Sequence, residues 1–248
     1  MVDSVRLEAL TWTDVETALA EGTETAIIGV GAIEQHGPHL PLLVDTLTSD
    51  ELARRIAIEL GDALATPTVR PGCSAHHMAF PGTLTVSEEL LKETVRAYCE
   101  SLDAHGFSNL VLLPTHGGNF APIKEVTPAL DDELDATVME LADIDRLMEL
   151  MNAGLRDAGI EYQEPVIHAG AAETAVVLAV ASGMVRTDAL ESGHEGEVSV
   201  EEILETGFRM VTETGVLGDP RQATAEAGDA ILDRIVDAYV EAIEAKRA

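Results

Sequence analysis

Short apolar runs alternate along the chain with longer segments in which apolar residues recur at helical spacing. The apolar runs are typical of strands buried on both faces of a parallel sheet, and they predict strands at 25–33, 110–114 and 137–142. The helical spacing predicts helices at 46–60, 85–104, 123–130, 173–183 and 225–245. Strands and helices therefore follow one another over most of the sequence.

This alternation predicts the fold class. Strands that alternate with helices form βαβ units, in which helices cover both faces of a parallel sheet. We therefore expect a three-layer α/β/α fold with a mostly parallel sheet. No repeat, low-complexity tract or linker interrupts the 248 residues, so residues 1–248 are predicted to form one domain, a length that a single core can fill.

The chain is strongly acidic, with 45 acidic and 15 basic residues and a formal net charge of −30. Such a chain repels nucleic acid and anionic membranes, so neither is expected as a partner. The acidic residues are spread along the chain, as in a protein adapted to high salt, where a Debye length of about 3 Å screens self-repulsion. We therefore predict a halophilic protein with a solvated acidic surface.

The expected location follows from two absences. The N-terminus lacks an apolar signal region, and no apolar run is long enough to cross a bilayer. The two cysteines, Cys73 and Cys99, do not form a CxxC pair and cannot supply a disulfide framework. These features predict a cytoplasmic protein with reduced thiols.

Polar residues gather directly after the predicted strands. Glu34 and His36 follow the first strand, two residues apart, so their side chains share one face of an extended segment. Asp45 comes next, near the start of a predicted helix. Ligands of open parallel sheets bind outside the carboxyl ends of the strands. Two carboxylates and an imidazole that meet there would suit Zn, Mn or Fe(II).

Three further loops carry histidines. His116 follows strand 110–114 and precedes two glycines, which let the backbone approach a ligand closely. His168 and Glu173 lie at a predicted helix start, where Glu173 could be only a partner of the helix dipole. The third of these loops holds His76 and His77. Together with the loop after the first strand, the three loops hold six of the eight histidines: His36, His39, His76, His77, His116 and His168. Their co-occurrence favours a metal site.

A glycine pattern invites a different interpretation. Gly29 and Gly31 could begin the G-x-G-x-x-G fingerprint of a dinucleotide-binding protein, but Glu34 replaces its third glycine. A carboxylate at that position would repel a pyrophosphate. The sequence also lacks a P-loop, so a nucleotide-binding protein is disfavoured.

Five motifs carry a resemblance to a known family: GAIEQHGPHLPLLVDT (31–46), FPGT (80–83), THGGN (115–119), HAGAAET (168–174) and GVLGDP (215–220). In these motifs the chain resembles the creatininase family of metal-dependent amidohydrolases, over roughly residues 29–220. The resemblance implies an α/β fold with a parallel sheet, two divalent metal ions per subunit, a homohexamer and a small-molecule amide substrate.

The resemblance also implies roles for individual residues. Glu34 and His116 would hold one ion and His36 the other, Asp45 would bridge them, and His168 stands where the family has its catalytic histidine. Creatinine-cleaving members have a glutamate ligand two residues after the HGGN-type histidine, where this chain has Gly118. Glu173 is our candidate to complete the shell of the second ion, with a catalytic base or a helix cap as the alternatives.

This site implies a reaction. Two metal ions about 3.5–4 Å apart can activate a shared water and polarise a carbonyl, and His168 could then move a proton to the departing nitrogen. We therefore predict a hydrolase that cuts a non-peptide or cyclic C–N amide bond of a small molecule. Two departures disfavour creatinine itself. His76-His77 replaces a Glu-His pair found in many relatives, and Trp12 is the only tryptophan, so the aromatic cap of creatininase pockets is not evident.

Three alternatives stay open. One is a formylaminopyrimidine ribotide deformylase of flavin or deazaflavin synthesis, which the retained EQHGPHLP motif disfavours. Another is a peptidase that trims a cofactor precursor. The third is a catalytically inert α/β binding or assembly protein, which should have lost one of the four residues Glu34, His36, Asp45 and His116; all are present.

Overall fold

A four-stranded parallel sheet forms the centre of the computed structural model, which describes residues 4–161 and 163–247. The strand order is β2-β1-β3-β4, with bounds β1 (Thr25–Val30), β2 (Ala63–Ala65), β3 (Asn109–Pro114) and β4 (Thr137–Glu140). All three pairings are parallel. Every residue of β1 is buried, as expected for a strand covered on both faces.

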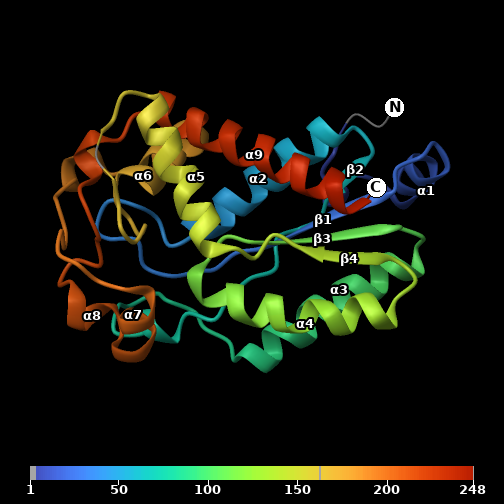
Figure 1. Cartoon of the computed structure of the whole chain (residues 1–248), viewed down its shortest axis with the longest axis horizontal. Coiled ribbons are helices and arrows are strands. Elements are labelled where there is room, and N and C mark those ends of the chain that lie inside the picture. Colours follow the sequence, from blue (N-terminus) through green and yellow to red (C-terminus); the bar gives the residue numbers. More distant parts are fainter. Residues whose placement is uncertain (1–3, 162, 248) are drawn as a thin grey trace.

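Helices cover both faces of this sheet (Figure 1). The helices α3 and α4 lie on one side, and α2, α5, α6 and α9 lie on the other. Their bounds are α1 (Trp12–Ala20), α2 (Val44–Leu60), α3 (Glu88–Ala104), α4 (Phe120–Glu133), α5 (Ile144–Asp157), α6 (Ala171–Ala181), α7 (Val200–Thr206), α8 (Phe208–Val211) and α9 (Ala225–Arg247). The predicted α/β/α fold with a parallel sheet is confirmed. None of the described helices is long and apolar enough to span a membrane.

The predicted elements are all present, although several boundaries differ. The first strand ends at Val30 instead of residue 33, because the chain leaves the sheet to form the polar loop that follows. The predicted cap of α3 is confirmed, since the Ser87 hydroxyl accepts a hydrogen bond from the Leu90 N–H at 3.3 Å. The sequence prediction missed β2 and four helices, α1, α5, α7 and α8. The strand β2 is only three residues long, and α5 begins at an Asp143 cap just after β4.

Close packing of α2 against β1 explains Gly29 in the strand and Gly31 just after it. A Cβ added at Gly31 would lie 2.9 Å from the Cα of Thr46, and one at Gly29 would lie 2.3 Å from the Ser49 hydroxyl. The Thr46 hydroxyl donates a 2.8 Å hydrogen bond to the Ala32 carbonyl. The glycines therefore let the first turn of α2, with Asp45, approach the carboxyl end of β1.

Helix α6 is held in place by apolar packing. Its residues Ala171, Ala175 and Val176 are buried in the main core, together with Ile231 and Ile235 of α9. Full burial of an aliphatic side chain the size of Val or Ile stabilises a fold by about 1.5–3 kcal/mol. This packing fixes the N-terminal turn of α6 beside the ends of β1 and β3.

Candidate metal centre

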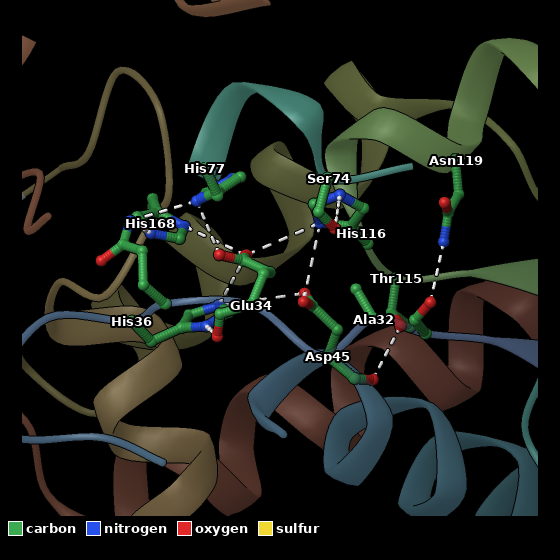
Figure 2. A network of polar contacts seen from close by, with 12 residues as sticks. Ala32, Glu34, His36, Asp45, Ser74, His77, Thr115, His116, Asn119 and His168 are labelled. Carbon is green, nitrogen blue, oxygen red and sulfur yellow. Dashed lines mark hydrogen bonds and ion pairs between the residues drawn. The ribbon is translucent and has the colours of Figure 1, made fainter. Parts of the chain in front are cut away.

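The six residues predicted for the site lie together beyond the carboxyl ends of β1 and β3. Five of them are labelled in Figure 2: Glu34, His36, Asp45, His116 and His168. They come from the loop after β1, the first turn of α2, the loop after β3 and the segment before α6. The sixth, Glu173, lies in the first turn of α6. Segments more than 130 residues apart in the sequence thus meet at one point.

The carboxylate and imidazole atoms form four overlapping groups, two of which share Asp45. The other two are Glu34, His36 and His168, and His76, His77 and His116. In the first group with Asp45, His116 Nδ1 lies 3.6 Å from both Glu34 Oε1 and Asp45 Oδ2. In the second group, His36 Nε2 lies 3.9 Å from Asp45 Oδ1 and 3.5 Å from Glu173 Oε2. All ligand atoms within each group lie within 4.8 Å of one another. Each group has the size of a metal coordination shell.

Several of these atoms are buried without a hydrogen-bond partner. They are Glu34 Oε2, His36 Nε2 and Asp45 Oδ2. A buried carboxylate or imidazole atom without a partner is costly, so such atoms are rare in folded proteins. Carboxylate oxygens and imidazole nitrogens are ligands that Zn²⁺, Mn²⁺ and Fe²⁺ accept. The residues present therefore fit a metal centre.

Neighbouring backbone groups orient the two histidines for binding a cation. The Nε2 of His116 lies 3.2 Å from the Cys73 carbonyl, and the Nδ1 of His36 lies 3.3 Å from the Glu34 carbonyl. A carbonyl only accepts hydrogen bonds, so each of these nitrogens carries the proton. The opposite nitrogen of each ring then presents its lone pair to the carboxylates. Such outer hydrogen bonds commonly fix the tautomer of metal-binding histidines.

Burial and close contact shift the pKa values of the groups in the centre. Burial raises the pKa of Glu34 well above its usual range and raises the pKa of Asp45 to about 7. Burial opposes the charged form of His36 too, but the Glu34 and Glu173 carboxylates raise its pKa above the ordinary value. Burial likewise opposes the charged form of Glu173, yet His36 lowers its pKa to about 2. These shifts place protons on Glu34, on His36 and partly on Asp45. A divalent cation in place of those protons would leave the carboxylates ionised and the imidazole neutral, which are the forms that bind metal.

His168 and His77 form the edge of the centre. The Nδ1 of His168 lies 3.8 Å from Glu34 Oε1, and burial lowers the pKa of His168 well below its usual value. The Nδ1 of His77 lies 2.6 Å from Glu34 Oε2, although without hydrogen-bond geometry. The Phe208 ring of α8 covers both histidines, with centroid distances of 4.2 Å to His77 and 4.3 Å to His168. His168 is therefore a neutral group held against the centre.

Not every histidine of the four loops joins the centre. His39 lies apart, and its Nε2 lies 2.9 Å from the Thr174 hydroxyl, which connects the first loop to α6. His77 was not among the predicted site residues, although the adjacent histidines in its loop were a signal for it. Gln35 was missed as well, because nothing in the sequence indicates which groups its amide contacts.

At Gly118, where creatinine-cleaving members have a glutamate, the structure leaves no room for a side chain. A Cβ added at Gly118 would lie 2.0 Å from the Cys73 carbonyl oxygen and 3.0 Å from His116 Nε2. A glutamate at this position would therefore displace the loop that orients His116. Glu173 instead approaches His36 from α6, on the other side of the centre.

A pocket opens above the centre and has an apolar wall. One end is formed by the polar residues of the centre, including Glu34, His116, His168 and Glu173. Side chains of α5, α7 and α8 form much of the wall: Leu147, Met148, Met151, Ile203, Leu204 and Phe208. Among the described residues, those that line the pocket include no lysine and no arginine. The pocket therefore suits an uncharged, apolar group bound next to the centre.

The sequence is similar to enzymes of known activity. The family model described as creatininase, creatinine amidohydrolase, matches residues 8–243. A mycofactocin precursor peptide peptidase of Mycolicibacterium smegmatis is 30% identical over 88% of this chain and 83% of its own length. The peptidase of the same name from Mycobacterium tuberculosis is 31% identical over 91% and 86%. The creatinine amidohydrolase of Pseudomonas putida is 26% identical over 98% and 97%.

Solved structures share the fold. A crystal structure of creatinine amidohydrolase superposes with a TM-score of 0.85 at 26% identity, over 99% of this chain and 98% of the other. A structure named "Creatininase Mn" gives 0.82 at 25% identity, over 98% and 99%. A creatininase variant described as "Zn-Zn type" gives 0.81 at 25% identity, over 99% and 99%. These names record manganese and zinc for those proteins.

The predicted family and enzyme class are confirmed. The matched family model spans nearly the whole chain, and the peptidase relatives reach 30–31% identity. The family consists of amidohydrolases, which are hydrolases that act on carbon–nitrogen bonds. By sequence and by fold, this chain belongs to the creatininase family.

Proposed function

We propose that the protein is an amidohydrolase that uses two divalent metal ions per chain. Glu34 and His116 would hold one ion, His36 and Glu173 would hold the other, and Asp45 would bridge them. The proposal is carried by the buried ligand atoms without hydrogen-bond partners, which gather in two groups around Asp45. When bound, ions in such a pair activate water and polarise the scissile carbonyl.

The residues around the ions have their own tasks in this proposal. His168 faces the centre through Nδ1 and would assist the departing nitrogen, a contribution of roughly 10²- to 10⁴-fold in rate. Phe208 covers His168 and His77 and would exclude water from them. Glu34 would remain a ligand, because it is buried and four histidine nitrogens lie within 4 Å of its carboxylate.

The pocket favours one kind of amide among the open alternatives. Its apolar wall and its lack of lysine and arginine suit a peptide with an apolar residue beside the scissile bond. The phosphate of a formylaminopyrimidine ribotide would instead meet a site with excess carboxylates and no lysine or arginine to pair with. We therefore place peptide hydrolysis first, in line with the peptidases among the relatives, and hydrolysis of a small cyclic amide second, in line with the creatininases.

A hydrolysis assay tests this choice. The metal-loaded protein is given creatinine, the ribotide, and two matched peptides that carry leucine or glutamate beside the scissile bond. We expect cleavage of the leucine peptide, about tenfold or more faster than that of the glutamate peptide, because a charge is costly in an apolar pocket. Preferential cleavage of creatinine or of the ribotide would contradict the peptide substrate. A loaded protein that cleaves none of the four would contradict the amidohydrolase itself.

Replacement of Glu173 by glutamine tests the second ion. Glutamine keeps the size of the side chain but loses the charge that faces His36 at 3.5 Å. We expect bound metal, measured by elemental analysis, to fall from about two ions to about one per chain. Glu226→Gln is the matched control, since Glu226 lies in the first turn of α9 and is exposed. Unchanged metal content in Glu173→Gln would show that Glu173 is not a ligand and would favour a helix-capping role.

Other features stay predictions from the sequence. They are the homohexamer, the cytoplasmic location, the adaptation to high salt and the single domain of residues 1–248. The choice among zinc, manganese and iron also stays open to measurement, because all three accept the oxygen and nitrogen ligands of the centre.

A further inference from the structure

Gln35 stands between two proposed metal ligands but its side chain contacts other groups. It is buried, with 5% of its surface exposed. Its amide Nε2 lies 2.8 Å from Nε2 of His168 and 3.1 Å from Nδ1 of His77. Gln35 is therefore a buried polar side chain whose amide lies against His168, the histidine at the edge of the centre.

Backbone contacts fix which way the Gln35 amide points. Its Oε1 accepts a 3.0 Å hydrogen bond from the Gly37 N–H, and its Nε2 lies 3.4 Å from the Gly215 carbonyl. Reversing the amide would place two donors together at Gly37 and two acceptors together at Gly215. The NH₂ group of Gln35 therefore faces His168, whose Nε2 must act as the acceptor.

Gly215 leaves room for this arrangement. Its φ of 83° lies in the left-handed region, which favours glycine. A Cβ at this position would lie 1.8 Å from Gln35 Oε1. The GVLGDP motif therefore contributes a glycine that lets the Gln35 amide reach His168.

We propose that Gln35 is a positioning residue that sets the tautomer of His168. Because Nε2 accepts from Gln35, the single proton of the neutral ring lies on Nδ1, the nitrogen 3.8 Å from Glu34 Oε1. His168 then acts in the reaction as a hydrogen-bond donor through Nδ1 to the substrate atom on which charge develops. This inference rests on the proposed function, since it requires His168 to face the substrate.

Two substitutions of Gln35 change its hydrogen bond to His168 while they nearly keep the size of the side chain. In Gln35→Glu the carboxylate accepts where the amide donates, which moves the proton of His168 to Nε2. In Gln35→Met the donor is lost with little change of size. We expect kcat to fall at least tenfold and up to roughly 10⁴-fold, the loss seen for a wrong histidine tautomer in serine proteases. The KM and the metal content should stay unchanged, and Gln222→Glu, at an exposed position, is the matched control.

A double-mutant cycle shows whether the loss acts through His168. In a His168→Ala background, Gln35→Met should cause no further loss of kcat. A ¹⁵N spectrum of histidine-labelled, zinc-loaded protein gives a second readout. The signals lost in His168→Ala should show a protonated Nδ1 in the native protein and a protonated Nε2 in Gln35→Glu.

The outcomes are distinct. Three results would each overturn the role of Gln35. The first is full kcat in both Gln35 variants, and the second is a loss of kcat from Gln35→Met that is as large in the His168→Ala background as in the native protein. The third is a protonated Nε2 of His168 in the native protein. Full activity of His168→Ala alone would instead overturn the role of His168 in the proposed function. A fall in kcat with unchanged KM that vanishes without His168 would support the inference.

Discussion

Replacing Asp45 with asparagine is expected to lower bound metal from about two ions to one or fewer per chain and to reduce hydrolysis about 10³-fold or more. The two carboxylate oxygens of Asp45 face different groups. Oδ2 lies 3.6 Å from His116 Nδ1, and Oδ1 lies 3.9 Å from His36 Nε2. Asparagine offers one oxygen and no charge, so it cannot serve both groups.

The size of this effect follows from where Asp45 lies. It is 3% exposed in the first turn of α2, and the close contact of Gly31 with Thr46 holds that turn against β1. Asp145→Asn is the matched control, because Asp145 lies in the first turn of α5 and is exposed. Elemental analysis and turnover are measured on both variants. An Asp45→Asn protein that keeps two ions would show that Asp45 does not bridge them.

Replacing His168 with alanine is expected to lower kcat by roughly 10²- to 10⁴-fold while the metal content stays at about two ions per chain. His168 lies at the edge of the centre, with Nε2 bonded to Gln35 and Nδ1 3.8 Å from Glu34 Oε1. It belongs to neither of the two groups that share Asp45, although its ring also lies within reach of Glu34 and His36 in a third group. Its loss should therefore affect the reaction and leave the ions in place.

His105→Ala is the control for this variant, because His105 is an exposed histidine at the end of α3. Steady-state kinetics and elemental analysis are run together on both proteins. Loss of one ion in His168→Ala would make His168 a ligand. Full turnover with both ions in place would remove it from the reaction.

The sheet and most helices could be predicted because their signals are local. A fully buried strand such as β1 is a continuous apolar run, and a helix such as α3 repeats its buried residues Leu91, Val95, Cys99 and Leu102 at helical spacing. The strand β2 has only the residues Ala63–Ala65, too few for a pattern. The helix α5 has both an amphipathic pattern and a capping Asp143, so its signals were present in the sequence.

The ligand residues could be predicted for a topological reason. Parallel strands end at one edge of a sheet, so Glu34 after β1 and His116 after β3 had to lie near each other. The contacts of Gln35 could not be predicted in this way, because Gly215 lies 180 residues further along the chain and in no strand. The apolar pocket wall could not be predicted from the sequence either, because α7 and α8 are short helices whose position depends on tertiary packing.

The central claim is that the chain holds two metal ions that its hydrolysis requires. Elemental analysis of the purified protein, after reconstitution with zinc or manganese and removal of excess metal, tests it most directly when turnover is measured on the same sample. The account predicts about two ions per chain, loss of hydrolysis on chelation and recovery when metal is returned. A protein that binds no metal after reconstitution, or that hydrolyses its substrate equally well without metal, would contradict it.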